Sequence, residues 1–253
     1  MNGRNIRILE LLAAHKKIKV AFLAELLSVS QVTLRRDLDN LERRGMIRRI
    51  HGYASLEGAD DTGRRMVFNY SVKQKIAKIA ALTVEEGETI MLESGSCCAL
   101  FAEELAMTHK NVTIITNSAY IANYIHRLPF AKVILLGGYY QPESQVLVGP
   151  MTIKSAEVLY SDKFFMGTDG FIPGQGFTGR DYLRAETVIG LTKRAKKIFI
   201  LTDASKFNHR GAYDLVQLDK LTGVFTDDSI PKEAEAALIK HNIQLHKVPS
   251  AKL

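Results

Sequence analysis

The chain has 253 residues, and 46% of them are hydrophobic, which is enough for a folded core and excludes a disordered protein. The net charge of +7 is concentrated in residues 1–56, where eleven Lys/Arg stand against five Asp/Glu and give +6; the rest holds 23 against 22. No apolar run could span a bilayer, the first residues lack the features of a signal peptide, and the adjacent Cys97 and Cys98 suit neither a disulfide framework nor a metal site. We therefore expect a cytoplasmic protein without a metal or cofactor, whose basic N-terminal module binds a polyanion.

Two amphipathic segments come first. Residues 4–15 repeat apolar side chains at helical spacing, and residues 20–27 predict a second, shorter helix with leucines available for the same core.

A third helix is predicted over residues 31–44. Ser30 suits its N-cap, and Gly45 suits the position after its end, where positive φ costs little. An apolar stripe along it is formed by Leu34, Leu38 and Leu41. The opposite side is basic and rich in hydrogen-bonding groups, and helix faces of that kind fit the major groove of B-DNA.

Residues 46–56 predict two short strands around a turn at His51-Gly52, which would form a basic wing beside the helix. Three helices and a wing within residues 4–56 are typical of a winged helix-turn-helix. The alternative is a helical hairpin that caps the larger domain, and the paired arginines of the helix and the wing argue against it. The residues expected to contact DNA are Ser30, Gln31, Val32, Thr33, Arg35, Arg36, Arg43, Arg48, Arg49 and His51.

The chain then divides at an aperiodic segment. Residues 57–70 mix Gly, Asp and other polar residues and predict a linker, which separates a DNA-binding domain at 1–56 from a second domain at 71–253. In the second domain short apolar runs alternate with helical patterns, interrupted by a Tyr139-Tyr140 loop and a Gly-rich loop at 171–179. Apolar strands alternating with helices predict an α/β domain with a mostly parallel sheet covered on both faces.

Ligands of open α/β sheets bind at the carboxyl ends of the strands, and polar, turn-forming residues recur at these ends here. The small residues Ser94, Gly95 and Ser96 open a helix, where free N–H groups could hold a phosphate. Lys206 adds a cation, and Asp169 and Asp203 could accept hydrogen bonds from sugar hydroxyls. The full set expected at the effector site is Ser94, Gly95, Ser96, Cys97, Asn117, Ser118, Gly137, Gly138, Asp169, Gly170, Glu186, Asp203 and Lys206.

Each of these features also has a simpler interpretation. The small residues at 94–96 alone are better explained as a turn with its N-cap, Gly137-Gly138 could only turn the chain, and Asp203 could only cap the next turn. Cys97 and Cys98 lie in a first helical turn, where a thiolate is favoured, but two small packing residues are the better interpretation. The repetition of such residues at successive strand ends predicts a pocket for a phosphorylated sugar or polyol.

With both halves laid out, the chain resembles the DeoR family of bacterial transcriptional regulators over nearly its whole length. The resemblance is carried by VSQVTLRRDLDNLERRGMIRRIHGYA in the first half and by ESGSCC, TNS, LLGG, FFMGTDG and DASKF in the second. It implies a sensor domain similar in fold to ribose-5-phosphate isomerase, DNA contacts from Arg35 and Arg36, and an effector site at the strand ends. The chain departs from the family pattern at Glu93, usually Asp, at Cys97-Cys98, usually threonines, and at Tyr53, usually Gly.

The leading hypothesis is a repressor that leaves its operator when a sugar phosphate binds, acting as a dimer or tetramer on repeated half-sites. One alternative is a sugar-phosphate isomerase or deaminase with an accessory DNA-binding domain, for which Asp169 and Glu186 are the candidate bases. Another is a DNA-binding protein whose second domain only oligomerises. Neither the effector, the operator nor the sign of regulation follows from the sequence.

Overall fold

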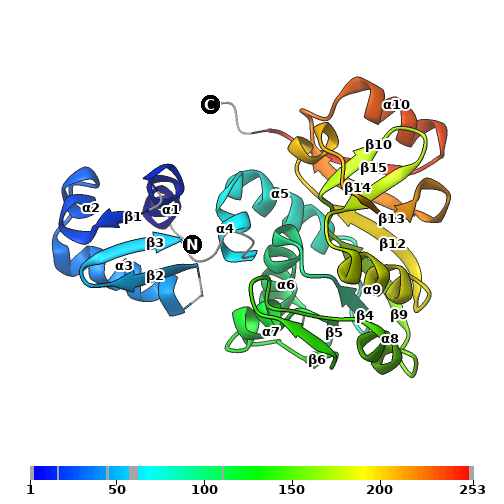
Figure 1. The fold of residues 1–253 in the computed structure, drawn as a ribbon, viewed down its shortest axis with the longest axis horizontal. Coiled ribbons are helices and arrows are strands. Elements are labelled where there is room, and N and C mark those ends of the chain that lie inside the picture. Colours follow the sequence, from blue (N-terminus) through cyan, green and yellow to red (C-terminus); the bar gives the residue numbers. More distant parts are fainter. Residues whose placement is uncertain (1–2, 16, 44–45, 57–61, 110, 251–253) are drawn as a thin grey trace. The chain divides into compact units, whose positions relative to one another are not determined.

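The computed structural model describes residues 3–15, 17–43, 46–56, 62–109 and 111–250. The chain divides into two compact units, Met1–Tyr70 and Ser71–Leu253, both drawn in Figure 1.

The first unit combines helices with a small antiparallel sheet in the order β1-β3-β2. The elements are α1 (Gly3–His15), β1 (Lys17–Lys19), α2 (Val20–Leu26), α3 (Gln31–Arg43), β2 (Ile47–Ile50) and β3 (Tyr53–Leu56). The leucine stripe of α3 is completely buried, as are Ile8 and Leu12 of α1, so the apolar face of each helix builds one core. The winged helix-turn-helix predicted from the sequence is confirmed, and the short strand β1 is an addition to it. Gly45 lies outside the described residues.

The segment predicted to be a linker is partly helical. Residues 57–61 lie outside the described part of the chain, but Thr62–Val67 form helix α4, which contacts α1. Thr62, Met66 and Val67 are buried, so this short helix belongs to the first unit and is not an irregular connection.

The second unit is built on a seven-stranded sheet in the order β15-β14-β12-β9-β4-β5-β6, with every neighbouring pair parallel. Its strands are β4 (Thr89–Leu92), β5 (Thr113–Thr116), β6 (Val133–Leu135), β9 (Ser161–Met166), β12 (Ala195–Leu201), β14 (Gly223–Asp227) and β15 (Gln244–Val248). Its helices are α5 (Tyr70–Ala81, which begins at the boundary residue), α6 (Ser96–Thr108), α7 (Ala119–Ile125), α8 (Pro150–Ala156), α9 (Tyr182–Thr192), α10 (Lys232–Lys240) and the 3₁₀ turns η1 (Ala204–Asn208) and η2 (Leu218–Lys220). The predicted α/β architecture is confirmed.

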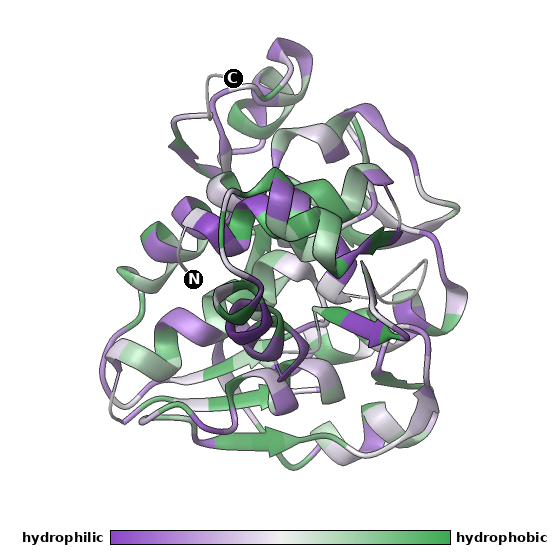
Figure 2. Ribbon diagram, turned by 90° about the vertical axis from the view of Figure 1, so that its left-hand side faces the viewer, coloured by the Kyte–Doolittle hydropathy of each residue, from purple (hydrophilic) through white to green (hydrophobic). Residues whose placement is uncertain are grey.

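The strand order reverses beside β4. From β4 the chain proceeds to β5 and β6 on one side, and then returns to β9 on the other side before β12, β14 and β15. Right-handed crossovers in opposite directions place helices on opposite faces, and Figure 1 shows α6 and α7 on one side of β4 and β5, with α8 and α9 on the other. In Figure 2 much of the strand ribbon is hydrophobic, whereas the helices have mixed hydropathy, as expected for a sheet that helices cover on both faces. The boundary between β4 and β9 is therefore the topological switch point.

Two small antiparallel sheets were not expected from the sequence. The Tyr139-Tyr140 loop is strand β7 (Tyr139–Gln141), which pairs with β8 (Val146–Val148). The Gly-rich loop is a hairpin of β10 (Gly170–Ile172) and β11 (Gly176–Gly179), to which β13 (Tyr213–Gln217) adds a third strand. These strands are short, and β10 and β11 contain Gly, so they lack the periodicity that revealed the main sheet.

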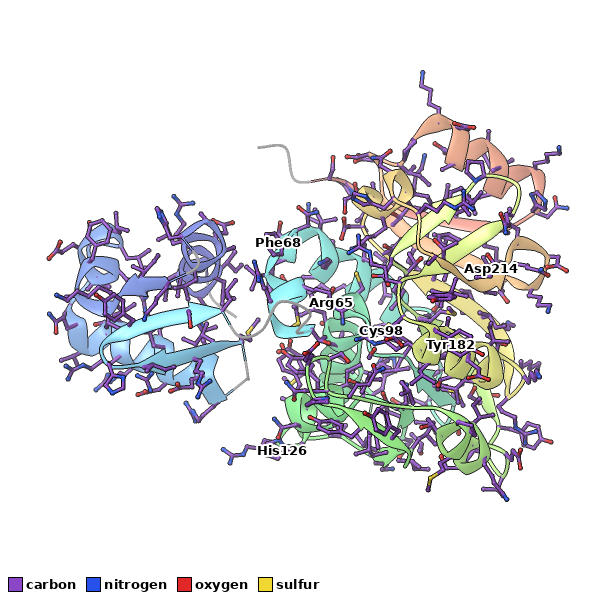
Figure 3. The ribbon with its side chains drawn as sticks, viewed as in Figure 1. Arg65, Phe68, Cys98, His126, Tyr182 and Asp214 are labelled. Carbon is purple, nitrogen blue, oxygen red and sulfur yellow. The ribbon has the colours of Figure 1, made fainter. Side chains whose placement is uncertain are left out.

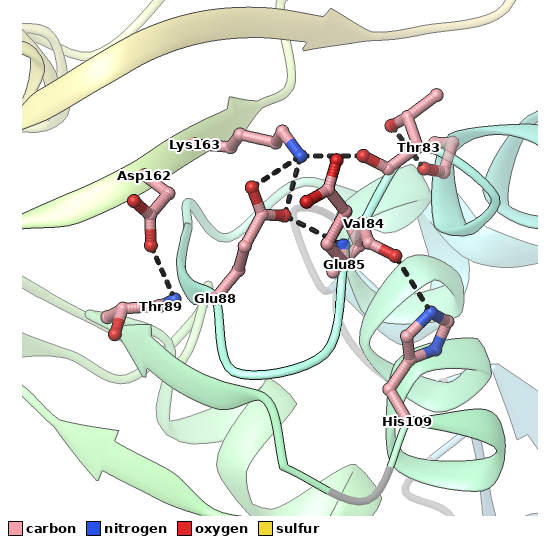
Figure 4. Close-up of polar contacts among 9 residues, drawn as sticks. Thr83, Val84, Glu85, Glu88, Thr89, His109, Asp162 and Lys163 are labelled. Atoms are coloured by element: carbon pink, nitrogen blue, oxygen red, sulfur yellow. Dashed lines mark hydrogen bonds and ion pairs between the residues drawn. The ribbon is translucent and has the colours of Figure 1, made fainter.

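A partly buried ion pair holds the loop between α5 and β4 at the amino ends of the strands. Lys163 of β9 donates to Thr83 O (2.6 Å) and to both carboxylate oxygens of Glu88 (2.7 and 2.5 Å) (Figure 4). His109, just after α6, contacts Val84 O through Nε2 (3.2 Å). This end of the sheet is closed by the protein's own contacts, opposite the edge where ligands of such sheets bind.

Candidate DNA-binding face and effector site

Helix α3 begins as the sequence predicted. Ser30 Oγ accepts a hydrogen bond from Thr33 N (3.1 Å), and the two hydroxyls lie 2.9 Å apart. Beyond this cap, Gln31, Arg35 and Arg36 are exposed, and Val32 exposes 62% of its surface. A polar and basic face is thus presented on the side of α3 opposite its buried leucines, which is the arrangement a groove-reading helix needs.

An ion pair missed from the sequence fixes the other side of this helix. Asp37 is buried, and its carboxylate accepts hydrogen bonds from two nitrogens of Arg4 on α1, Nε (2.5 Å) and NH2 (3.2 Å). The hydrogen bond to Asp37 raises the pKa of Arg4 above its ordinary value. A bidentate contact of this kind fixes orientation as well as distance, so α3 is held on α1 in one rotation.

The wing turns at His51 and Gly52, which have φ of 49° and 79°, and both residues are exposed. Its two arginines differ in their surroundings. Arg48 is exposed, whereas Arg49 NH2 lies 2.5 Å from Asp39 Oδ1 and 2.6 Å from Glu42 Oε2, and the bond to Glu42 raises the pKa of Arg49. Arg49 therefore joins the wing to α3, while Arg48 faces solvent.

An open hollow of about 520 Å³ lies between the start of α2, α3 and the wing. It is lined by Lys19, Val20, Ala21, Gln31, Arg35, Glu42, Arg49 and Gly52. Three of these side chains are cations and one is an anion. Lys19 was missed from the sequence because nothing in its neighbourhood shows that β1 brings it beside α3.

In the second unit, the turn after β4 touches the end of β9 at the switch point. An added Cβ on Gly95 would lie 3.1 Å from Gly167 Cα, and one on Gly167 would lie equally close to Gly95 Cα. Glu93 bridges the two segments, because its carboxylate accepts hydrogen bonds from the backbone N–H of Gly167 (3.2 Å) and from the hydroxyl of Ser94 (2.6 Å). Ser94 is buried, so its hydroxyl is committed to Glu93 in this state.

Helix α6 starts near several charged side chains, of which Lys73, Asp203 and Asp227 are buried and Lys206 is half-buried. Its first internal hydrogen bond runs from Ala99 N to Gly95 O (3.0 Å), so the amides of Ser96, Cys97 and Cys98 are the ones a helix leaves for other partners. Burial raises the pKa of the Cys97 thiol to about 12, and the surrounding charges are Lys73, Lys206, Asp203 and Asp227. Cys97 is therefore a protonated packing residue rather than a thiolate. Cys98 Sγ contacts Phe165 O (3.6 Å) inside the unit (Figure 3).

Asn117 and Ser118, which follow β5, have different environments. Asn117 is buried, its Nδ2 donates to Leu147 O (2.9 Å), and its Oδ1 has no hydrogen-bond partner among the described residues. Ser118 Oγ accepts from Ile121 N (3.1 Å) and so caps α7. Asn117 thus has a buried acceptor that no described residue satisfies, whereas Ser118 has a structural role that was not predicted from the sequence.

Tight packing accounts for two of the predicted glycines. A Cβ on Gly138 would lie 1.8 Å from Thr152 Oγ1, and one on Gly170 would lie 2.4 Å from His209 O. Gly137 has open space around its Cα. Two further predicted carboxylates, Asp169 and Glu186, are half-buried. Asp169 accepts a hydrogen bond from the backbone N–H of Arg180 (3.1 Å), and Glu186 lies on α9.

A polar network beside α9 was missed from the sequence. Arg184 Nε donates to Gln141 Oε1 (2.9 Å), and Asp181 caps α9 by accepting Arg184 N (2.8 Å). This network joins β7 to α9. The sequence gives no sign of it, because Tyr139 and Tyr140 were expected to lie in a loop.

Neither a metal site nor a membrane span is found in the described part of the chain. No group of three or more His, Cys, Asp or Glu is placed to hold a metal ion. None of its helices combines the length and apolar character needed to cross a bilayer.

Comparison with known proteins covers both units. Residues 4–58 match the family model "DeoR-like helix-turn-helix domain", and residues 68–228 match "DeoR C terminal sensor domain".

Several curated proteins are similar over most of the chain. The HTH-type transcriptional regulator GolR of Listeria innocua is 32% identical over 90% of this chain and 91% of its own length. The L-fucose operon activator of Escherichia coli K12 is 30% identical over 89% of this chain and 95% of its own length. The glycerol-3-phosphate regulon repressor of the same strain is 26% identical over 96% of this chain and 97% of its own length. Among solved structures, ribose 5-phosphate isomerase A from Methanocaldococcus jannaschii is 22% identical over 55% of both chains, with a TM-score of 0.39.

Proposed function

Since this chain belongs to the DeoR family of transcriptional regulators, we propose that it represses a carbohydrate-utilisation operon and is released from its operator by a phosphorylated sugar or polyol. DNA binding follows from the family. The operon, the effector and the repressing sign are the proposal, supported by relatives named as an L-fucose operon activator and a glycerol-3-phosphate regulon repressor.

We place sequence reading on the exposed face of α3. Arg35 and Arg36 have the length and the paired donors to reach guanine, and Val32 offers an apolar contact for a thymine methyl group. Arg48 and His51 of the wing supply contacts to the phosphate backbone, which carry affinity rather than sequence choice. Arg49 supports the wing instead, because Asp39 and Glu42 already hold its guanidinium.

The observation that carries the effector proposal is the composition of the β4–β9 switch point. The start of α6, Lys206 and the buried acceptor Oδ1 of Asn117 all follow the carboxyl ends of strands in this half of the sheet. Helix amides and a lysine suit a phosphate group, and a buried acceptor without a partner costs free energy that a ligand hydroxyl recovers. Phosphate and hydroxyl together describe a sugar phosphate or a polyol phosphate.

An enzymatic role is less well supported than regulation. The similar curated proteins are named transcriptional regulators, and both family models describe parts of regulators. The candidate base Asp169 already accepts the amide of Arg180.

We also propose that the protein acts as a dimer or tetramer. A single winged module buries little surface on DNA, and two modules on repeated half-sites supply the affinity that one lacks. Sedimentation with and without operator DNA tests this.

A thermal-shift screen of sugar and polyol phosphates, each paired with its unphosphorylated form, tests the effector proposal. A hit should raise the melting temperature only in its phosphorylated form, and should weaken operator binding in a gel-shift titration by about 5- to 150-fold, the usual range of allosteric coupling. Lys206→Ala should keep operator binding and lose the response. If hits stabilise the protein yet leave operator affinity unchanged, the sensing role is wrong. If none binds, the second unit serves assembly alone.

A further inference from the structure

The hollow between the start of α2, α3 and the wing carries an excess of positive charge. Glu42, the anion among its described lining residues, is already paired, because Arg49 donates to Glu42 Oε2 from Nε (2.9 Å) and from NH2 (2.6 Å). Two lining cations remain, Lys19 of β1 and Arg35 of α3. Neither side chain makes an ion pair with a described residue. The hollow therefore offers two uncompensated cations to an anion that enters it.

Backbone contacts fix Lys19 beside the tip of the wing. Lys19 is the register partner of Tyr53, the first residue of β3, and the next residue, Val20, donates its N–H to Gly52 O (2.9 Å). Gly52 belongs to the exposed turn of the wing and itself lines the hollow. The exposed side chain of Lys19 thus borders the hollow on the wing side, whereas Arg35 borders it on the helix side.

The walls of the hollow belong to the elements that the proposed function brings to the duplex. When a helix lies in the major groove, the sugar-phosphate strand that borders the groove runs alongside that helix. A strand on that path passes the mouth of a hollow that α3 and the wing enclose. Each phosphodiester carries a negative charge and accepts hydrogen bonds, and a lysine ammonium is a compact cation with three donors.

We propose that the hollow receives one phosphate of the DNA backbone, which Lys19 binds through its ammonium group and the charge of Arg35 further stabilises. This inference rests on the proposed DNA contacts of α3 and the wing, and it adds β1 to them as a third element. Because every nucleotide presents the same phosphate, Lys19 contributes affinity without sequence choice.

The same strand offers a matched control. Lys17 lies two residues before Lys19 on the same face of the sheet, and it is also exposed. It is not among the described residues that line the hollow, and its Nζ lies 4.6 Å from the centre of the Tyr53 ring. Lys19→Gln and Lys17→Gln remove the same charge from the same strand, but only the first removes it from the hollow.

The test measures binding of the full chain to a duplex of random sequence, because a phosphate contact does not depend on the bases. Titrations by fluorescence anisotropy are made at several salt concentrations. Lys19→Gln should weaken binding at low salt by at least about tenfold, the loss expected for one charge-assisted hydrogen bond. It should also reduce the slope of log affinity against log salt by about 1 per bound module. Lys17→Gln should keep the slope of the wild type and stay close to its affinity.

Two results would overturn the inference. Equal losses for the two lysine variants would mean that β1 acts only through its general charge, and an unchanged salt slope for Lys19→Gln would mean that no phosphate is bound there. Both lysines are exposed, so neither variant should change the melting temperature. A destabilised Lys19→Gln with the wild-type salt slope shows a structural role and contradicts the proposal.

Operator DNA separates this inference from the proposed function. Lys19→Gln should lose as much affinity for the operator as for random duplex, and it should still release the operator when effector is added. A larger loss on the operator would show that Lys19 reads bases, and the phosphate assignment would be wrong. A wild type that never responds to an effector refutes the proposed function, while the comparison of Lys19→Gln with Lys17→Gln still decides the role of the hollow.

Discussion

Gly137 and Gly138 are adjacent, yet an added methyl group has opposite consequences at the two positions. At Gly138 it would collide with the hydroxyl of Thr152 in a backbone of φ 151°, whereas at Gly137 it meets open space. Gly138→Ala should lower the free energy of unfolding by about 1–3 kcal/mol, the usual cost of overpacking, while Gly137→Ala should change it little. Urea denaturation of both variants measures this, and equal stabilities would mean that Thr152 moves aside freely.

Cys97 should make stability fall in alkaline solution. Burial raises the pKa of its thiol from 9.0 to about 12, so the folded protein keeps a proton that the unfolded chain loses. The contribution is fully present below pH 9 and is lost as the pH rises towards 12, at no more than about 1.4 kcal/mol per pH unit. Denaturation between pH 8 and pH 10 should show a steeper decline for the wild type than for Cys97→Ala. Parallel curves would contradict the raised pKa.

At the scale of residues, the sequence located side chains whose roles depend on local spacing. The capping hydroxyl of Ser30 and the exposed arginines of α3 follow from helical periodicity alone. The ion pair of Lys73 and Asp203 could not be found in this way, because a lysine in an amphipathic helix normally faces solvent and Asp203 is distant in the chain. Asp37 was missed for the same reason, since Arg4 lies on another helix.

Among the elements, the wing and α3 are joined by the side chain of Arg49. Arg49 of β2 lies against Asp39 and Glu42, and its side chain is 30% exposed. Arg49→Ala should lower the free energy of unfolding of the first unit by about 1 kcal/mol, the upper range for partly exposed ion pairs, and Arg48→Ala should leave it unchanged. Thermal denaturation resolves the two variants. If Arg48→Ala were equally destabilising, the wing would be held by another contact.

Elements of the main sheet were predictable because most of its strands contain an apolar run and are bounded by turns and helices. The strands β7, β10, β11 and β13 were not, since they are short and lie outside the main sheet, where alternation is weak. Helix α4 was missed because a six-residue helix offers too few turns for a period to be visible. Its stability comes from packing, which no local pattern reveals.

For the whole molecule, the uneven charge predicts strongly salt-dependent DNA binding. Residues 1–56 carry nearly all of the net charge of +7, so operator affinity should fall linearly on a logarithmic salt scale. Arg48→Ala, which removes a proposed phosphate contact, should weaken binding to operator and random duplex alike and reduce the slope by about 1 per bound module. Arg36→Ala should instead weaken the operator more than random duplex. Titrations by fluorescence anisotropy at several salt concentrations distinguish the two, and an identical loss for both variants would contradict the assigned roles.

The architecture of the whole chain followed from its sequence, because the basic helical half and the alternating half differ in both charge and period. The switch point could not be derived, since it depends on strand order, and no local signal shows that β9 returns beside β4. The polar residues at each strand end could be identified from the sequence, but which of these ends lie beside one another is known only from the fold.

Arg49 has a further effect on the surface that meets DNA. Asp39 and Glu42 are negative groups on the helix that approaches a polyanion, and Arg49 covers both of them. Without it, two uncovered carboxylates would repel the nucleic acid at short range. This cation therefore helps the protein approach DNA by shielding its acidic neighbours.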